Sequence, residues 1–289
     1  MLFTNRHLIT AMVTPFDDHQ QLDLTRLKVL IEHLLAHHTQ GILVGGTTGE
    51  GPTLSDTEKL TLFKQTATLV AGRVPVIANT GSNNTQASIA FTKKVSQIAG
   101  IDAALVVVPP YNKPDQAGML AHFTAIADQG GLPIIIYNIP GRVGVNMNVT
   151  TVLALAQNPR IIGIKQCGSD SDLAAIINGS PADFAVFTGE DAQTLTARIL
   201  GATGVISVAS HVFGDQMTQV ETALAANDWR KAGQIQRALI PKMAALFSYP
   251  SPAPVKAALN ALQIPVGAPR LPLLPLTHQQ TNALLQQLR

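Results

Sequence analysis

Residues 133–166 read PIIIYNIPGRVGVNMNVTTVLALAQNPRIIGIKQ, and this stretch decides the fold. Two short apolar runs, Pro133–Asn138 and Ile161–Gln166, flank the segment Val149–Gln157, which we predict to be a helix. The runs are apolar at consecutive rather than alternate positions, which is typical of strands that are covered on both faces. A strand, a helix and a second such strand form the repeating unit of a parallel sheet.

The same pattern recurs along the chain, with strand starts 34, 33, 29, 30, 28, 23 and 20 residues apart. Amphipathic segments lie between the strands, and Ser55 with Glu58 forms a capping box that opens one of these helices. Eight such repeats predict a (βα)8 TIM barrel, an α/β fold, over residues 1–226. The predicted strands are His7–Thr14, Gly41–Gly46, Val74–Thr80, Ala103–Pro109, Pro133–Asn138, Ile161–Gln166, Phe184–Gly189 and Gly204–Ala209.

Residues 227–289 follow the eighth repeat and contain three more helical segments. These are Asp228–Ser248, Pro254–Gln263 and Thr277–Arg289, with four prolines between the last two. We predict a C-terminal helical extension of the barrel.

Composition excludes several classes of protein. The chain has 289 residues, of which 46% are hydrophobic and only 13% charged, with a formal net charge of +2. A disordered chain and a nucleic-acid-binding basic stripe are therefore both excluded. The low charge indicates buried subunit interfaces. Cys167 is the only cysteine, so a cytoplasmic location fits best. The eight histidines show no metal-ligand spacing, and we expect neither a metal nor another cofactor.

Polar side chains gather where the predicted strands end, which is where (βα)8 barrels carry their active sites. Lys165 is the one charged residue in the apolar run Ile161–Gln166. One interpretation is a lysine whose stem packs on apolar surface while its ammonium reaches the rim or pairs with a carboxylate. The other is a nucleophile that forms a Schiff base with a carbonyl substrate, which burial favours by disfavouring the charged amine.

Three further features adjoin this position. Adjacent strand ends lie about 5 Å apart, so Tyr137 is either a buried core residue or a proton relay for an intermediate at Lys165. Arg142 is either a solvated charge or a bidentate clamp for a substrate carboxylate. The loop Gly45–Gly51, GGTTGEG, lacks the lysine of a phosphate-binding loop and suits either a small carboxylate or a tight turn. We predict Cys167 to be a small buried side chain rather than a second nucleophile.

Four motifs are similar in order and spacing to those of the dihydrodipicolinate synthase / N-acetylneuraminate lyase family. They are GTTGE at 46–50, YNKP at 111–114, YNIPGR at 137–142 and GIKQ at 163–166. The resemblance covers the whole chain and implies a lyase with class I aldolase chemistry on pyruvate, in a homotetramer of tight dimers. For the synthases of the family it implies condensation of pyruvate with L-aspartate 4-semialdehyde in diaminopimelate and lysine biosynthesis.

The resemblance assigns catalytic roles to four positions. Lys165 resembles the Schiff-base lysine and Tyr137 the proton-relay tyrosine. Thr47 resembles the threonine that links two tyrosines, and Tyr111 the tyrosine that each subunit lends to its neighbour's site.

Four other positions resemble substrate-binding residues. Thr48 matches the residue that contacts the carboxylate of pyruvate, and Arg142 matches the one that binds the carboxylate of the second substrate. Gly189 and Ile206 match positions that line the pyruvate pocket.

Two alternatives to the synthase are open. The first is another pyruvate-dependent aldolase of the family, acting on N-acetylneuraminate or a keto-deoxy sugar acid. Such sialic acid lyases usually have Ser-Thr in place of Thr47-Thr48 and an uncharged residue at Arg142, whereas Gln166 and Pro110 depart from the usual synthase pattern. The second is a non-catalytic barrel, which loss of the lysine or the tyrosines would indicate, and all of these are present.

The resemblance also bears on regulation, because lysine inhibits many synthases of the family from a cleft between subunits. Matching positions here are Ala87 for a glutamate, Asp56 and Lys59 for two histidines, and Pro110 for a tyrosine, while Asn83 is retained. Since Ala87 offers no partner to an ammonium group, we expect an enzyme that is insensitive to lysine.

Overall fold

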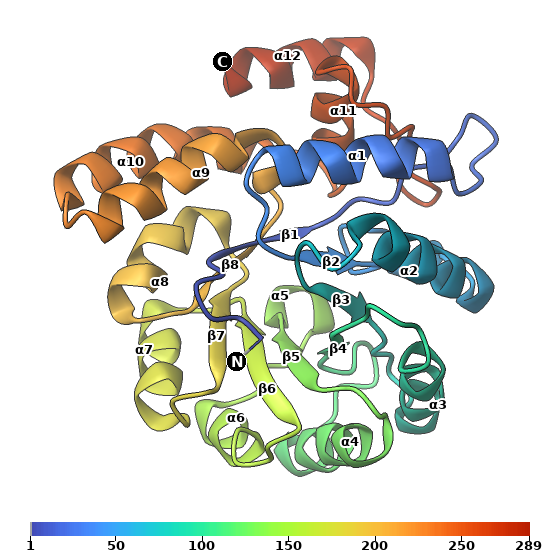
Figure 1. The fold of residues 1–289 in the computed structure, drawn as a ribbon, viewed down its shortest axis with the longest axis vertical. Helices are drawn as coiled ribbons and strands as arrows, with labels where there is room; N and C mark the ends of the chain where they lie inside the picture. The colour runs from blue at the N-terminus through green and yellow to red at the C-terminus, as the bar shows by residue number, and fades with distance from the viewer. Residues whose placement is uncertain (1) are drawn as a thin grey trace. The chain divides into compact units, whose positions relative to one another are not determined.

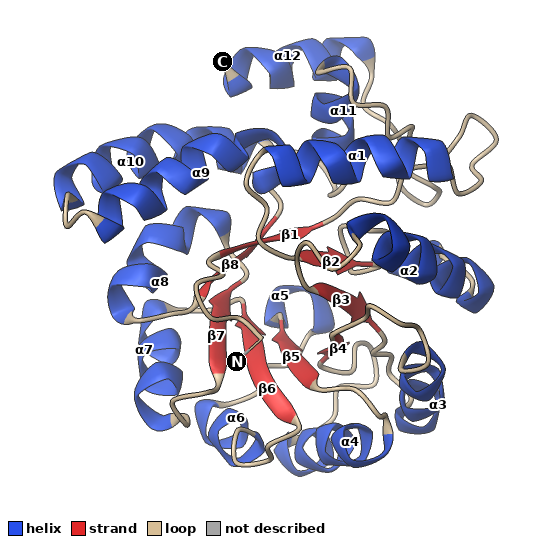
Figure 2. Cartoon of the chain, in the orientation of Figure 1, coloured by secondary structure: helices blue, strands red, loops and turns tan. Residues whose placement is uncertain are grey.

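The computed structural model describes residues 2–289, and within them eight strands are hydrogen-bonded in chain order and close into a barrel. Helices alternate with the strands (Figure 2), which confirms the predicted (βα)8 fold. The strands are β1 (Leu8–Ala11), β2 (Ile42–Val44), β3 (Val76–Asn79), β4 (Ala103–Val107), β5 (Ile134–Asn138), β6 (Ile161–Gln166), β7 (Ala185–Thr188) and β8 (Gly204–Ser207).

The helices agree with the predicted pattern and add a short one, α5, that the sequence did not reveal. The helices are α1 (Leu24–Ala36), α2 (Asp56–Val70), α3 (Thr85–Val95), α4 (Gln116–Gln129), α5 (Pro140–Val143), α6 (Val149–Leu155), α7 (Asp170–Gly179), α8 (Thr194–Leu200), α9 (Ser210–Ala225), α10 (Trp229–Ala245), α11 (Ala253–Ala261) and α12 (His278–Leu288). Two single-turn 3₁₀ segments, Gly51–Thr53 and Asp191–Gln193, precede α2 and α8. The capping box at Ser55 is confirmed, since its hydroxyl accepts from the Glu58 N–H and Glu58 accepts from the Ser55 N–H.

The chain divides into two compact units. One comprises Pro75–Ile206 with the N-terminal residues up to His7, and the other comprises Leu8–Val74 and Ser207–Arg289. The predicted division at residue 226 falls between α9 and α10, and it stays a prediction.

In the first unit, strands β3 to β7 pair in parallel, and the helices α3, α4, α6, α7 and α8 lie outside them (Figure 1). The side chains of β5 are buried along its whole length, as its continuous apolar sequence predicts. The Cα atom of Tyr137 on β5 pairs with that of Lys165 on β6, and Lys165 pairs in turn with Phe187 on β7. This register places a tyrosine and a lysine side by side at the carboxyl ends of neighbouring strands.

The second unit holds β1, β2, the helices α1, α2 and α9, and the predicted C-terminal extension, which consists of α10, α11 and α12. Helix α11 contacts α9 and α12, and α12 also contacts α10. The Phe16 N–H donates to the Val266 carbonyl at 3.1 Å, which ties the segment after α11 to the loop after β1. The extension is therefore joined to the loops that follow the strands of its own unit.

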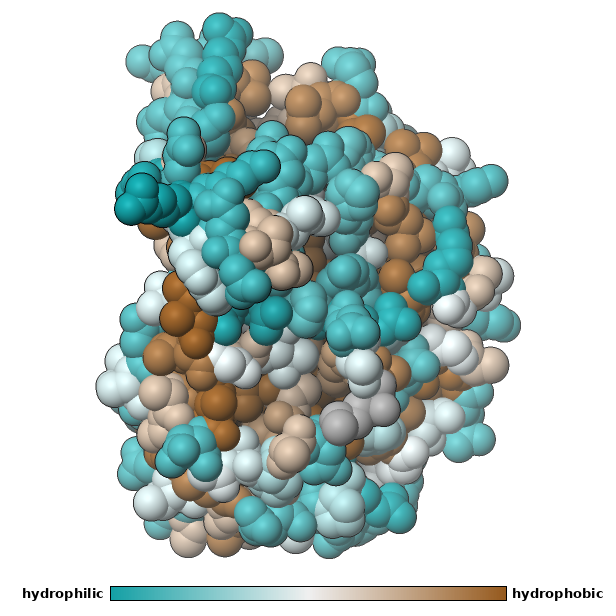
Figure 3. Space-filling view, turned by 60° about the vertical axis from the view of Figure 1, so that its left-hand side comes forward, coloured by the Kyte–Doolittle hydropathy of each residue, from teal (hydrophilic) through white to brown (hydrophobic). Residues whose placement is uncertain are grey.

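Apolar side chains form patches between polar ones on the face seen in Figure 3. Among the large apolar residues that are exposed are Ile199 on α8 and Trp229 and Ile240 on α10. Within residues 2–289, no helix is long and apolar enough to cross a membrane.

Candidate active site

Lys165 lies near the carboxyl end of β6 and is only 5% exposed. Its Nζ atom is 4.7 Å from the centroid of the Tyr137 ring, within the range of a cation–π contact. Tyr137 is itself buried at 5% exposure. The structure thus brings together the two residues that the sequence predicted as nucleophile and proton relay.

A buried polar pair lies one residue further along the same two strands. The Asn138 side-chain amide donates to the Gln166 carbonyl oxygen Oε1 at 3.0 Å and to the Met147 backbone oxygen at 3.0 Å, and Asn138 Oδ1 accepts from the Met147 N–H at 3.1 Å. These bonds fix the ends of β5 and β6 and the loop after α5. Sequence reasoning missed Asn138, although its signal was an amide directly after Tyr137 on an otherwise apolar strand.

Cys167 and Gly189 enclose the stem of Lys165. A methyl group built at Gly189 would lie 2.8 Å from Lys165 Cε and closer still to Cys167 Sγ. The pKa of the Cys167 thiol is raised to about 12, mainly by burial and also by Glu190, against the lowering effects of Lys165 and Arg142. Cys167 is therefore a buried thiol, as predicted, and not an activated nucleophile.

Arg142 and Tyr111 are both exposed. Arg142 lies in the last turn of α5, which begins at Pro140, where the missing N–H costs no helical hydrogen bond. Tyr111 lies between β4 and α4 with a φ of +73° and 91% of its surface exposed. The next residue anchors this loop, because the Asn112 side-chain amide donates to the Asn83 carbonyl at 3.0 Å. The structure does not bring the Tyr111 ring into the buried cluster around Lys165.

The remaining predicted residues of the first unit lie close to the barrel interior. Ile206 on β8 is fully buried, and Gly189 follows β7 and is half-buried. Gly189 N–H donates to the Gln166 carbonyl at 2.8 Å, so β7 is joined to β6 directly beyond Lys165.

Thr47 and Thr48 lie in the loop after β2, in the second unit. Gly45 has a φ of +67°, and the Gly51 N–H donates to the Gly46 carbonyl at 3.0 Å, so the loop is a compact turn. Thr48 is 7% exposed and Thr47 is half-buried. The segment is a tight turn, and its backbone hydrogen bonds hold both threonines in defined positions.

Several other polar side chains predicted at strand ends bond within the protein interior. Thr80 accepts a hydrogen bond from the Thr92 hydroxyl at 2.8 Å, and the Ser207 hydroxyl accepts from the Ser210 N–H at 2.8 Å. These hydroxyls satisfy buried groups of their own unit.

The chain is a parallel (βα)8 barrel with a buried lysine beside a tyrosine near the carboxyl ends of neighbouring strands, which is where (βα)8-barrel enzymes have their active sites. The model of the dihydrodipicolinate synthetase family matches residues 4–289, and the chain belongs to this family.

Similar proteins are known from several organisms. The chain is 55% identical over 289 residues, covering both proteins completely, to a protein of Ligilactobacillus salivarius (strain UCC118) named 4-hydroxy-tetrahydrodipicolinate synthase. The crystal structure of dihydrodipicolinate synthase DapA-2 from Bacillus anthracis matches with a TM-score of 0.96 and 44% identity, covering 98% of this chain and 97% of that one. A dihydrodipicolinate synthase from Cyanidioschyzon merolae, solved with lysine bound, matches with a TM-score of 0.94 and 40% identity, covering 97% of this chain and 96% of that one.

Proposed function

We propose that the chain catalyses the 4-hydroxy-tetrahydrodipicolinate synthase reaction, in which pyruvate and L-aspartate 4-semialdehyde condense through a Schiff base on Lys165. The observation that carries this proposal is the buried Lys165 amine over the Tyr137 ring at the carboxyl ends of β5 and β6. Full-length relatives of that name, among them one 55% identical, support it.

The chemistry requires a neutral amine and a proton carrier beside it. Lys165 Nζ attacks the keto carbon of pyruvate, and the resulting carbinolamine loses its hydroxyl, with a proton, as water to leave an imine. Loss of a methyl proton from the imine gives an enamine, whose carbon then attacks the aldehyde of the second substrate. We assign the proton transfers to the Tyr137 hydroxyl, because its ring already lies against the amine.

The substrate carboxylates need separate donors. We assign the carboxylate of pyruvate to Thr48, with Thr47 completing the proton relay, because their turn is rigidly bonded and Thr48 is buried. Arg142 is assigned to the carboxylate of the second substrate, since its exposed guanidinium can form a bidentate contact. Gly189 and Ile206 are assigned to the wall of the pyruvate pocket.

Tyr111 is assigned to the site of a neighbouring subunit in a homotetramer. Its exposure of 91% and its left-handed backbone support this role, because the ring can bury apolar surface against a second subunit and strained backbone conformations cluster at functional sites. Sedimentation analysis tests the tetramer, and a monomer at the enzyme's working concentration would contradict it. The cytoplasmic location stays a prediction.

Two measurements on the purified protein test the function. Pyruvate with borohydride should add one reduced three-carbon group at Lys165, mapped by peptide mass spectrometry, and Lys165→Ala should lose both the adduct and nearly all turnover. An adduct at another lysine would contradict the assignment. Turnover of pyruvate with aspartate semialdehyde, compared with pyruvate and N-acetylmannosamine, separates the synthase from a sialic acid lyase, and faster reaction of the sugar would overturn the proposed substrate.

A further inference from the structure

Glu50 closes the GTTGE motif, yet the reaction proposed above gives it no role. Its side chain is 2% exposed, and its carboxylate points into the second unit rather than toward solvent. Oε1 lies 2.6 Å from Lys256 Nζ, and Oε2 accepts the Arg270 backbone N–H at 2.7 Å. Both partners belong to the C-terminal extension, Lys256 on α11 and Arg270 in the segment before α12.

Lys256 is as deeply buried as its partner, with 1% of its side chain exposed. Its ammonium also donates to the Ala268 carbonyl at 3.2 Å and lies 4.3 Å from the centroid of the Phe16 ring. Burial lowers the pKa of Lys256 to about 8, and the Glu50 carboxylate opposes this shift. An ammonium group in this position depends on its carboxylate, because desolvating an unpaired charge costs several kcal/mol.

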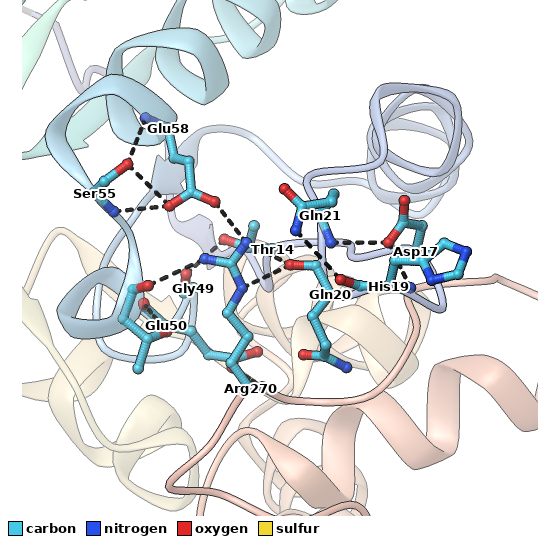
Figure 4. A network of polar contacts seen from close by, with 11 residues as sticks. Thr14, Asp17, His19, Gln20, Gln21, Gly49, Glu50, Ser55, Glu58 and Arg270 are labelled. Atoms are coloured by element: carbon cyan, nitrogen blue, oxygen red, sulfur yellow. Dashed lines mark hydrogen bonds and ion pairs between the residues drawn. The ribbon is translucent and has the colours of Figure 1, made fainter.

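Arg270 connects the C-terminal extension to the segment that follows the GTTGE motif. Its Nη2 atom donates to Glu58 Oε1 at 2.5 Å, and Nε donates to the Gln20 carbonyl at 2.9 Å (Figure 4). Its Nη1 atom donates to the Thr53 carbonyl at 3.1 Å. The hydrogen bond from Arg270 lowers the pKa of Glu58 to about 2. The extension therefore contacts both the end of the motif and the start of α2.

Backbone hydrogen bonds connect Glu50 to the turn that holds the threonines. Glu50 has a φ of +55°, a left-handed conformation that a non-glycine residue keeps only when its surroundings enforce it. Its N–H donates to the Thr47 carbonyl at 3.1 Å, and the neighbouring Gly49 carbonyl accepts from the Thr14 hydroxyl at 2.5 Å. Releasing the Glu50 side chain removes the tertiary contact that holds this conformation.

We propose that Glu50 is a positioning residue, through which Lys256 of the C-terminal extension holds the Thr47–Thr48 turn in the geometry that binds the carboxylate of pyruvate. The proposal rests on the proposed function, in that it takes Thr48 as the carboxylate donor. It adds that affinity for pyruvate is set by an ion pair that does not touch the substrate.

The experiment measures the pyruvate concentration that gives half-maximal borohydride trapping, which requires no second substrate. Glu50→Gln keeps the shape of the side chain and an acceptor for Arg270 but removes the charge, and Lys256→Met removes the ammonium while filling its space. Each should raise the half-saturating concentration about 10-fold or more, the range expected for loss of a charge-assisted contact. The KM for aspartate semialdehyde should stay within about twofold, a split that simple loss of folded protein would not produce.

The double variant Glu50→Gln/Lys256→Met is the control for misfolding, because it leaves neither partner of the ion pair as an unpaired charge in the interior. It should fold, and its half-saturating pyruvate concentration should rise about as much as in either single variant, because the single and double variants all remove the same Glu50–Lys256 contact. Glu32→Gln is the matched control in the same unit, since Glu32 pairs with Arg73 at 2.7 Å on the exposed surface, and it should leave trapping unchanged.

The outcomes separate the two proposals. Absence of pyruvate trapping in the unaltered protein would overturn the proposed function, and the role of Glu50 with it. Normal trapping in the unaltered protein, together with an unchanged half-saturating concentration in the folded double variant, would overturn the positioning role alone. An equal rise in Glu32→Gln would also overturn it, because the effect would then follow from charge and not from the buried pair.

Discussion

Replacing Gly189 by alanine should displace the reacting amine while leaving the barrel intact. The added Cβ would lie 2.8 Å from Lys165 Cε, 0.6 Å short of the 3.4 Å at which ordinary contact begins, and it would overlap Cys167 Sγ. Both obstacles are side-chain atoms that can rotate, and the backbone of Gly189 does not lie in the left-handed region. The strain is therefore relieved by moving Lys165 and Cys167 rather than by unfolding.

The expected magnitude follows from that displacement. Misplacing a reacting group by 1 Å costs about 100-fold in rate, so a shift near 0.6 Å should slow imine formation by roughly 10- to 100-fold. Overpacking a buried site typically costs about 1–3 kcal/mol in the free energy of unfolding. The loss of rate should therefore exceed what the small loss of stability explains.

The assay is the rate of adduct formation at saturating pyruvate, followed by intact mass after borohydride quenching, with thermal unfolding measured in parallel. Gly233→Ala on α10 is the control, because the nearest atom to its added Cβ is the flexible Arg237 Nη1 at 3.3 Å. Adding Cys167→Ala to Gly189→Ala should recover part of the rate, since it frees space for the new methyl group. A folded Gly189→Ala protein that forms the adduct at the unaltered rate would refute the reasoning.

Four other predictions concern single steps. Tyr137→Phe should lower kcat by about 10²- to 10⁴-fold at near-normal stability, and a kcat within twofold of the parent would exclude the relay. Arg142→Ala should raise the KM for aspartate semialdehyde about 10- to 150-fold and leave that for pyruvate unchanged, whereas an equal loss for both substrates would argue against separate carboxylate sites. L-lysine should not inhibit initial rates, because Ala87 and Pro110 supply neither carboxylate nor ring, and half-inhibition below about 1 mM would contradict this. Burial lowers the pKa of His211 to about 4, so between pH 6.5 and 4 the unfolded chain binds more protons at this residue than the folded chain does. As the pH falls through that window, His211 should therefore lower the free energy of unfolding, measured by urea titration, by up to about 1.4 kcal/mol per pH unit. A His211→Asn variant with an unchanged slope would contradict the assignment.

Sequence patterns predicted the elements best where burial and hydrogen bonding coincide. The strand Ile161–Gln166 has the predicted bounds. The strand predicted over His7–Thr14 is only Leu8–Ala11, because Met12 and Val13 are buried in a loop rather than in the sheet. Apolar sequence reports burial, and a loop packed into the core gives the same signal as a strand.

Helix starts were predicted where the cap has a two-residue signature. Ser55 and Glu58 form such a pair, and α2 begins as expected. The sequence predicts a helix over Ser88–Ala99, but α3 begins three residues earlier, at Thr85, because the Asn84 side chain caps it by accepting the Ala87 N–H at 3.0 Å. A lone asparagine in a polar loop is too common in turns to mark a helix start by itself.

The candidate site was predictable to the extent that strand register determines it. Tyr137 and Lys165 lie at the ends of adjacent strands, and the parallel register pairs them directly. The position of the Tyr111 side chain was harder to predict, because it lies on an exposed loop whose backbone geometry the neighbouring residues do not specify. Glu50 was visible as part of a motif, but its partners lie more than 200 residues away.

The two buried lysines show why residue type alone does not assign chemistry. Lys165 stands in an aliphatic strand, where any charge is conspicuous, whereas Lys256 lies on a helix, where a lysine ordinarily faces solvent. We infer their different roles from their neighbours. The Lys256 ammonium is 2.6 Å from a buried carboxylate, and the attraction stabilises the proton that an amine must lose before it can attack a carbonyl. The Lys165 amine lies over the Tyr137 ring near the carboxyl ends of β5 and β6, at the end of the barrel where (βα)8 enzymes bind their substrates. Trapping with pyruvate should therefore modify Lys165 and spare Lys256, although both side chains are withdrawn from water to a similar degree.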